Sequence, residues 1–326
     1  MSAREFCFTI SRPRSERIAL VAVSGASNVT GFVQPIHRLA RKAHAVGARI
    51  LVDAAQLAPH RAIDVKADDD PEHLDYVALS AHKMYAPFGV GALVGRHDTF
   101  LRGAPEYRGG GTVEIVTPDF VHWAGLPDRE EAGSPNVVGA LALAVAAQTL
   151  MDAGMDSVQQ HEASVTAYAL QRLRSVPGIT IYGQSDTAQA ADRVGVLPFN
   201  IGSLPHALVA AILSHEAGIG VRSGCFCAQL YVTRLLGITD REQRRWQGEY
   251  LAGDRSNRPG MVRISLAAYN TTDDIDALIH MLCRIARNDY EGLYYQVPET
   301  GEYRVAGEED ISDWLSRTYA LSELRR

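Results

Sequence analysis

The stretch Asp75–Arg96 reads D-Y-V-A-L-S-A-H-K-M-Y-A-P-F-G-V-G-A-L-V-G-R, and it indicates how the chain around it is folded. Two apolar, β-rich runs, Asp75 to Leu79 and Val90 to Val94, are typical of strands. A polar segment containing Lys83 lies between them and becomes rich in proline and glycine toward its end. We therefore expect a strand, a sharp turn that carries Lys83, and a second strand.

Lys83 can be interpreted in two ways. A lysine in a turn is ordinarily a solvated surface residue, because charged side chains rarely leave water. At the end of a buried strand, however, a lysine is costly unless it is paired or used chemically. In a partly dry site a lysine amine has a lowered pKa and becomes a nucleophile that forms a Schiff base with an aldehyde. Ser80 and His82, within three residues of Lys83, are good donors to a phosphate group.

A second motif favours the chemical interpretation. The run Ala48 to Gln56, A-R-I-L-V-D-A-A-Q, is a short apolar strand that ends in Asp53 and Gln56, about thirty residues before Lys83. The chain resembles the class V aminotransferase family of pyridoxal phosphate (PLP) enzymes. The resemblance rests on a V-D-A-A-Q motif that is followed by S-x-H-K and then by P-x-G-x-G. Within that family the chain is most similar to the cysteine desulfurase and selenocysteine lyase branch. The resemblance covers roughly residues 17 to 287, and the paired motifs are specific.

The order of the expected elements indicates an α/β fold. Arg17 to Val23 is a buried type of strand, and apolar residues at helical spacing predict a helix over Val33 to Val46, before the strand that ends at Asp53. Strand, helix and strand in this order predict a parallel, doubly wound sheet, in which ligands bind at the carboxyl ends of the strands. Six polar residues fall at these predicted ends: Asn28, Asp53, Gln56, Ser80, His82 and Lys83.

We expect two domains and a tail. Helices over Val137 to Ala153 and Met155 to Val176 are followed, after Pro177-Gly178, by short strands and helices. The expected parts are a PLP-binding large domain over 1–153 with a mainly parallel sheet, a smaller α+β domain over 154–290, and a C-terminal tail over 291–326. The resemblance implies fold type I of the PLP-dependent transferases, with the N-terminal part of the large domain missing.

Three segments have simple structural interpretations. The acidic run Asp68 to Asp70 and His73 are expected to form a solvated connecting loop. The polar run Arg241 to Gln247, R-E-Q-R-R-W-Q, is expected to be a solvated helix face rather than an RNA contact. Thr271 or Thr272 is expected to cap the last helix.

The composition is that of an ordinary globular protein. The 326 residues are 46% hydrophobic and 21% charged, and the net charge of −6 gives no bulk basic surface for nucleic acid. The longest apolar run, Val137 to Ala147, is too short to span a membrane, and the first residues lack the pattern of a signal peptide. The four cysteines, Cys7, Cys225, Cys227 and Cys283, make no disulfide framework in a chain of this length. A cytoplasmic location is expected.

The resemblance implies a role for the polar residues at the strand ends. Lys83 would form the Schiff base with PLP, and Asp53 would sit against the pyridine nitrogen. A nearby carboxylate keeps that nitrogen protonated, and each pKa unit corresponds to about 1.4 kcal/mol. Gln56 would donate to the ring hydroxyl, while Ser80 and His82 would bind the phosphate.

Three further residues have implied roles and simple alternatives. Ser134 matches a position that reaches the phosphate of the partner subunit, which implies a homodimer; alternatively, Ser134 or Asn136 is a plain helix N-cap. Asn28, which also belongs to the implied cofactor-binding set, and Arg263 match positions that hold the substrate carboxylate. An arginine fork suits a carboxylate, whereas the alternative for Arg263 is a surface arginine near a strand.

Cys227 carries the most specific functional prediction. In R-S-G-C-F-C-A-Q its spacing from Arg222 and Gly224 matches the desulfurase nucleophile, whose thiolate attacks the sulfur of PLP-bound cysteine, keeps a persulfide and releases alanine. An arginine nearby and a helix starting behind it lower the pKa of a thiol. A buried, inert cysteine is the alternative. A C-x-C metal site lacks a second Cys/His pair, so no metal is expected. Cys225 stands where many relatives carry histidine.

The expected function is that of a PLP-dependent, cysteine desulfurase-like enzyme acting on L-cysteine, with a sulfur-acceptor protein as a candidate partner. A transaminase, lyase or epimerase for another amino acid, which would not need Cys227, is one alternative. A non-catalytic homologue that only dimerises is another. Relatives carry a phosphate-gripping turn and a ring-stacking side chain before the strand at Arg17, and Met1 to Glu16 supplies neither. A shortened sheet would leave strand edges and apolar faces uncovered.

Overall fold

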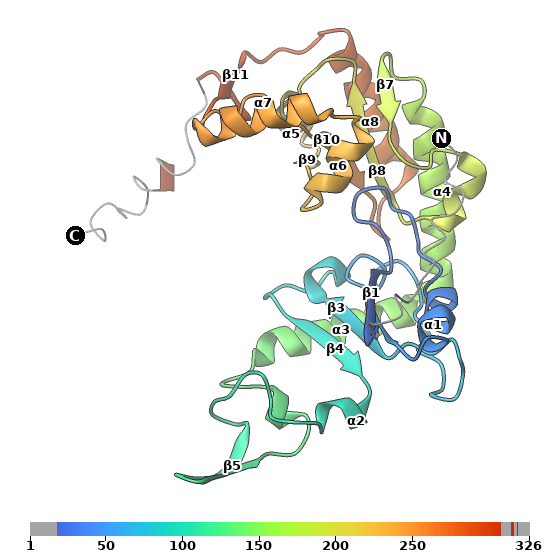
Figure 1. Cartoon of the computed structure of the whole chain (residues 1–326). Coiled ribbons are helices and arrows are strands. Elements are labelled where there is room, and N and C mark those ends of the chain that lie inside the picture. The colour runs from blue at the N-terminus through green and yellow to red at the C-terminus, as the bar shows by residue number, and fades with distance from the viewer. Residues whose placement is uncertain (1–17, 308–313, 316–317, 319–326) are drawn as a thin grey trace. The chain divides into compact units, whose positions relative to one another are not determined.

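The computed structural model describes residues 18–307, 314–315 and 318 (Figure 1). The chain forms two compact units, each with its own four-stranded sheet. Of the described residues, unit 1 comprises 18–163 together with Ala191–Val194, and unit 2 comprises Ser164–Ala190 and those from Gly195 onward. The division falls inside the helix α4 (Met155–Leu173), ten residues after the boundary that the sequence predicts.

The sheet of unit 1 is mainly parallel, as predicted. Its strands lie in the order β1 (Leu20–Ser24), β2 (Arg49–Asp53), β3 (Tyr76–Ser80) and β4 (Gly91–Gly95). The first three run parallel, and β4 is antiparallel to β3. The helix α1 (Ile36–His44) packs against β2 and buries its apolar side there. This helix is shorter than the predicted range 33–46, because it begins only after Pro35.

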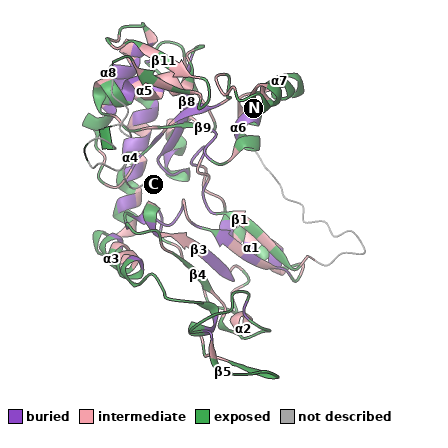
Figure 2. Ribbon diagram, turned by 90° about the vertical axis from the view of Figure 1, so that its left-hand side faces the viewer, coloured by how far each residue is buried: buried purple, intermediate pink, exposed green. Residues whose placement is uncertain are grey.

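The rest of unit 1 is less buried. It comprises the 3₁₀ turns η1 (Ala81–Met84) and η2 (Asp128–Glu130), the short helix α2 (His97–Phe100), the hairpin of β5 (Val113–Thr117) and β6 (Phe120–Trp123), and α3 (Val137–Ala153) with the start of α4. Figure 2 shows α3, β4 and β5 largely exposed. The apolar residues Val137, Leu141 and Val145, four residues apart on α3, are 67%, 66% and 57% exposed. Uncovered apolar surface of this kind was expected for a shortened sheet.

Among the described residues no single helix is long and apolar enough to cross a bilayer. The helices α3 and α4 meet that criterion only when they are taken together, by length and composition, and they are bent by 78° at their junction.

Unit 2 is an α+β unit with an antiparallel sheet. The strands lie in the order β7 (Ile179–Ile181), β8 (Val196–Ile201), β10 (Met261–Ser265) and β9 (Arg222–Gly224). A single apolar core joins this sheet to α5 (His206–Ala217), α8 (Thr272–Ala286) and the part of α4 from Ser164 onward. Phe199, Leu213 and Leu282 are fully buried in it. The predicted α+β architecture of this part is therefore observed.

Side-chain caps define the starts of two helices in unit 2. Thr239 and Glu242 form a capping box at the start of α7 (Asp240–Leu251), and Thr271 and Asp274 form another at the start of α8. The second pair identifies Thr271 as the predicted cap. The helix α7 buries none of its residues, as the sequence predicts for a solvated face. The short helix α6 (Gln229–Leu235) and the 3₁₀ segment η3 (Thr187–Asp192) complete the described helices.

The segment predicted as a tail, 291–326, begins as a folded part of unit 2. The strands β11 (Tyr294–Val297) and β12 (Glu302–Val305) form a hairpin, and β12 packs against α5. The carboxylate of Glu216 on α5 accepts hydrogen bonds from the backbone N–H groups of Glu291 at 3.0 Å and Gly292 at 2.9 Å and from the Tyr294 hydroxyl at 3.0 Å. Sequence reasoning missed the hairpin because no compositional signal separates its short strands from a polar tail.

Glu216 makes the attachment of this hairpin dependent on pH. Burial alone raises the pKa of its carboxyl, but the donors of Gly292, Glu291 and Tyr294 outweigh burial and hold the pKa below its usual value. A lowered pKa in the folded state stabilises the attachment above the unfolded-state pKa, and this contribution is lost as the pH falls through the folded-state pKa. We expect hydrogen-exchange protection of residues 291–297 to fall in that acidic range. In Glu216→Gln, protection should be weaker at neutral pH and nearly independent of pH; equal pH dependence in both proteins would contradict this role.

Candidate active site

The carboxyl ends of the three parallel strands bring the predicted polar residues to one edge of the sheet. Asp53 is the last residue of β2 and pairs in register with Ser24, the last residue of β1, and with Ala78 of β3. Ser80 ends β3, and Asn28 lies in the turn that follows β1. Since parallel strands end together, these residues share the edge at which ligands of such sheets bind.

Lys83 lies in η1, which follows β3 directly. Ala81 and Met84 of this turn are buried and anchor it, while Lys83 is half-buried. The Nζ atom of Lys83 donates a hydrogen bond to Oε1 of Gln56 at 3.1 Å. Lys83 thus has a side-chain partner in the turn, and its chemical role stays a prediction.

Two other polar residues at this edge, Asp53 and His82, are more exposed than Lys83. Ser80 Oγ lies 2.8 Å from Nδ1 of His82, whose side chain is exposed. Asp53 is exposed as well, and its Oδ1 accepts a hydrogen bond from the N–H of Ala55 at 3.0 Å. An amine, a carboxylate and a hydroxyl–imidazole pair thus lie on neighbouring strand ends.

A buried network behind Gln56 was not found from the sequence. Gln56 Nε2 lies 3.2 Å from Nε2 of His60, and His60 Nδ1 lies 3.0 Å from Glu162 on α4. Arg61 bonds the second carboxylate oxygen of Glu162 at 2.9 Å. Only the i, i+4 spacing of Gln56 and His60 hints at this arrangement in the sequence; Glu162 lies about a hundred residues away.

The loop after Lys83 is held by the start of α3. Tyr85 and Phe88 adopt left-handed backbone angles, with φ of 67° and 75°. The side-chain amide of Asn136 donates to the carbonyl of Phe88 at 2.6 Å, and its Oδ1 accepts from the N–H of Gly139 at 2.9 Å. Asn136 is thus the N-cap of α3, and Ser134 is an exposed residue of the preceding loop rather than the cap.

Cys227 and Arg263 belong to unit 2. Cys227 is exposed, on a turn in which it and Phe226 have left-handed φ angles of 60° and 54°. Arg263 on β10 pairs in register with Arg222 on β9, and its guanidinium carbon lies 5.0 Å from the centroid of the Phe226 ring. Burial first, and then the charge of Arg222, lower the pKa of Arg263, whereas Cys227 acts in the opposite direction.

Cys225 differs from Cys227 in its surroundings. Cys225 is buried, and its thiol donates to the carbonyl of Pro259 at 3.1 Å. Burial raises the pKa of this thiol, and the charge of Arg258 only partly offsets the increase. Cys283 is a third free thiol, and Cys7 lies outside the described residues.

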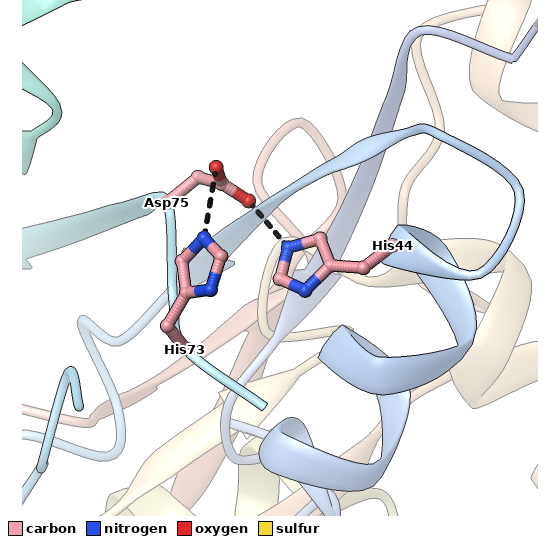
Figure 3. A group of neighbouring side chains, drawn as sticks. All are labelled: His44, His73 and Asp75. Carbon is pink, nitrogen blue, oxygen red and sulfur yellow. Dashed lines mark hydrogen bonds and ion pairs between the residues drawn. The ribbon is translucent and has the colours of Figure 1, made fainter. Parts of the chain in front are cut away.

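The group of His44, His73 and Asp75 offers three metal-ligand atoms within 4.8 Å of one another (Figure 3). Nε2 of His44 lies 2.9 Å and Nε2 of His73 lies 3.5 Å from the carboxylate of Asp75. The two rings are stacked, however, with centroids 4.2 Å apart and planes inclined by 21°. A metal ion binds imidazole in the ring plane, so one ion cannot lie in both of these nearly parallel planes. The group therefore serves better as a structural contact than as a metal site.

The expectation of a solvated loop is wrong for His73, whereas Asp68 and Asp69 of the acidic run are exposed as expected. His73 is 13% exposed, and both rings bond backbone carbonyls through Nδ1, His44 to Pro71 and His73 to Asp70. Burial raises the pKa of Asp75, but His44 and the N–H of Ile50 outweigh it and keep the pKa low. The loop is thereby fastened to the end of α1, at the amino end of β3 and away from Lys83.

The model of the aminotransferase class-V family matches residues 9–278. The chain belongs to the aminotransferase class-V family. Members of this family with known structures share its fold. A cysteine desulfurase from Thermococcus onnurineus superposes with a TM-score of 0.68 at 31% identity, over 82% of this chain and 60% of that one. A cysteine desulfurase from Escherichia coli, in an S-sulfonic acid form, gives 0.67 at 29% identity, over 84% and 60%.

Curated relatives that this class-V chain matches are also named cysteine desulfurase. The cysteine desulfurase of Dickeya dadantii is 37% identical over 274 residues, which are 83% of this chain and 58% of that protein. The cysteine desulfurase of Cronobacter sakazakii is 34% identical over 83% of this chain and 59% of that protein. The chain therefore spans about 60% of the length of the relatives it matches. Its fold is that of the fold type I PLP-dependent enzymes, as the sequence predicts.

Proposed function

We propose that this class-V chain binds PLP through Lys83 and acts as a cysteine desulfurase-like enzyme on L-cysteine. One observation carries the proposal: several polar side chains lie at neighbouring strand ends of one sheet. They are Lys83, Gln56, Asp53 and the Ser80–His82 pair. The similarity to proteins named cysteine desulfurase supports the choice of reaction.

The chemistry of these side chains fits the parts of PLP. An aldehyde needs an amine, which Lys83 supplies. A pyridinium nitrogen is stabilised by a carboxylate, and the exposed Asp53 provides one. A phosphate accepts hydrogen bonds from Ser80 and His82, and Gln56 has a second amide hydrogen for the ring oxygen. When bound, PLP would withdraw electrons from the α-carbon of an amino acid joined to it.

Cys227 is the proposed sulfur acceptor on the enzyme. Its sulfur would form a bond to the sulfur of the substrate cysteine, while the carbon–sulfur bond of that substrate breaks and its electron pair stays on carbon. Uptake of a proton at that carbon gives alanine, and the sulfur atom remains on Cys227 as a persulfide. The exposure of Cys227 favours this role, whereas Cys225 is buried and its raised pKa favours the inert thiol.

Arg263 and Asn28 are proposed to hold the substrate carboxylate. Two arginines, Arg222 and Arg263, lie opposite each other on neighbouring strands, where like charges are unfavourable unless an anion lies between or near them. A carboxylate is such an anion, and a guanidinium binds it through two parallel hydrogen bonds.

The first prediction concerns Lys83. The chain has three lysines, Lys42, Lys66 and Lys83, so the attachment site of the cofactor can be read directly. After incubation with PLP and reduction with borohydride, we expect mass spectrometry to find the pyridoxyl group on the Lys83 peptide. Lys83→Ala should abolish this modification and the visible absorbance retained after desalting, while Lys66→Ala should keep both. Equal modification of all three lysines would indicate non-specific reaction and would count against the proposed site.

The second prediction separates the two neighbouring cysteines. With PLP and L-cysteine, Cys227→Ser should reduce alanine formation by at least about a hundredfold, because a hydroxyl is a far weaker nucleophile than a thiolate. Cys225→Ser should keep most of the activity, since its thiol is buried and bonded to a carbonyl. Unchanged turnover in Cys227→Ser would favour the transaminase or lyase alternative. No turnover in any protein that binds PLP would favour the non-catalytic alternative.

We further propose that the chain forms a homodimer and that Ser134 contacts the phosphate bound by the partner subunit. The exposed stripe of Val137, Leu141 and Val145 on α3, close after Ser134, supports an interface there, because large exposed apolar patches mark association sites. A sulfur-acceptor protein, which would take the persulfide from Cys227, belongs to the same proposal.

Sedimentation can test the interface. Leu141→Asp should raise the dimer dissociation constant at least about tenfold, because burying a leucine contributes about 1.5–3 kcal/mol. Gln243→Asp, on the exposed and polar helix α7, is the matched control and should leave association unchanged. A monomeric wild-type chain, or equal association of both variants, would contradict the interface.

A further inference from the structure

Lys83 is connected to a buried carboxylate by an unbroken series of side chains in unit 1. Lys83 Nζ donates to Gln56 Oε1 at 3.1 Å. Gln56 Nε2 lies 3.2 Å from His60 Nε2. His60 Nδ1 lies 3.0 Å from Glu162 Oε1. The turn after β2 places Gln56 and His60 four residues apart on the same side, and α4 supplies Glu162.

The inner end of this series is closed to water and rich in positive charge. The side chains of His60 and Arg61 are each 8% exposed, and Glu162 is 2% exposed. Arg61 bonds Glu162 at 2.9 Å and the carbonyl of Arg193 at 2.5 Å. Arg193 is fully buried, and burial lowers its pKa to about 10 against the opposing effect of Glu162. Glu162 therefore bonds Arg61 directly, and its charge also acts on Arg193.

The donors and acceptors fix the form of each side chain in the series. A carboxylate only accepts, so His60 must carry a hydrogen on Nδ1. The amide of Gln56 turns its carbonyl oxygen to Lys83 and its NH₂ group to His60, which is the orientation that an ammonium on Lys83 requires. His60 Nε2 then accepts, which requires a neutral ring with its single hydrogen on Nδ1. The contacts at the Glu162 end and at the Lys83 end are therefore both satisfied by a His60 ring with its hydrogen on Nδ1.

We propose that His60, oriented by Glu162, is a positioning residue that locks the amide of Gln56 and thereby sets the charge state of Lys83. In the locked orientation Gln56 offers only its carbonyl oxygen, which favours the ammonium form of Lys83. The opposite orientation would donate an N–H to a neutral Lys83 amine. It would also turn the Gln56 oxygen toward His60 and require a second hydrogen on that ring, next to Arg61 and Arg193.

The lock therefore couples two protonation states. The neutral amine of Lys83 is the form that can attack an aldehyde, and turning over the Gln56 amide or breaking its hydrogen bond would favour that form. Among the described contacts, the charged groups at the His60 end of the series are Glu162, Arg61 and Arg193. At the other end the charged group is Lys83 itself. The inference deepens the proposed function, because its bearing on PLP rests on Lys83 being the PLP-binding lysine.

The first test needs no cofactor. In protein labelled with ¹⁵N-histidine, the shifts of the two ring nitrogens distinguish the tautomers and the imidazolium, and His60→Gln assigns His60 among the 11 histidines. We expect His60 to remain a neutral ring with hydrogen on Nδ1 between pH 6 and 8. A ring with hydrogen on Nε2, or an imidazolium at pH 7, would overturn the proposal. The tautomer is read in the wild-type protein, and the variant serves only to assign the signals of His60.

The second test measures the amine of Lys83. Trace acylation at a series of pH values, read by mass spectrometry, gives the titration midpoint of each of the three lysines, with Lys42 and Lys66 as internal references. His60→Asn keeps an N–H toward Glu162 but loses the acceptor toward Gln56, and it should lower the Lys83 midpoint by about one pH unit, a tenfold change in the ratio of ammonium to amine. His60→Gln, which can place its oxygen near the former Nε2, should restore most of the shift.

The pair of variants separates positioning from simple structural support. A midpoint that moves equally in both variants, or in neither, would overturn the proposal, because only a positioning role depends on an acceptor at that place. Failure of the proposed function would leave these results unchanged, since both are measured without PLP. Conversely, borohydride attachment of PLP to Lys83 together with an unmoved midpoint would support the function and refute the lock.

Discussion

The parallel register of β1, β2 and β3 is the constraint on which the candidate site depends. It aligns Ser24, Asp53 and Ala78, so the chain leaves the sheet three times at the same edge. A shift of one residue would send Asp53 to the other face and replace it by an apolar neighbour, because side chains alternate along a strand. Buried Ile50 and Val52 fix the register, since each must stay inside. The apolar core of β2 thus determines where a carboxylate reaches the ligand edge.

The second constraint is the cost of burying charge beneath that edge. Glu162, Arg61 and Arg193 lie almost out of reach of water, and removing ions from water costs several kcal/mol each unless they are well paired. Here Arg61 bonds the carboxylate of Glu162 and the carbonyl of Arg193, and Arg193 bonds the carbonyl of Thr30. Such a network adds little net stability, but it allows few orientations. Its physical effect is to make the turn that carries Gln56 rigid.

Sequence patterns predicted the sheet, the helix α3 and the position of Lys83, because apolar periodicity and chain order determine those features locally. They did not predict the pairing of His60 with Glu162 or of His44 with Asp75. A histidine looks the same in sequence whether it is solvated or buried, and the partner that decides this lies 31 residues away for His44 and about a hundred for His60. The hairpin after residue 291 was missed for a similar reason, since it is held by Glu216 on a distant helix. The roles assigned to Lys83, Cys227 and Arg263 stay predictions.

The turn C-F-C shows how one short segment gives two thiols different properties. Phe226 and Cys227 both hold left-handed backbone angles, a conformation that costs a residue with a side chain roughly 1–2 kcal/mol. The strain is sustained because the residues before Cys227 are fixed: Cys225 is buried against Pro259, and Phe226 is buried beneath the guanidinium of Arg263. Two anchored residues in sequence leave the third directed outward, so Cys227 is exposed although its neighbours are core residues. A more relaxed turn would allow the thiol to share their burial, and burial raises a thiol's pKa and removes the thiolate on which nucleophilic sulfur chemistry depends.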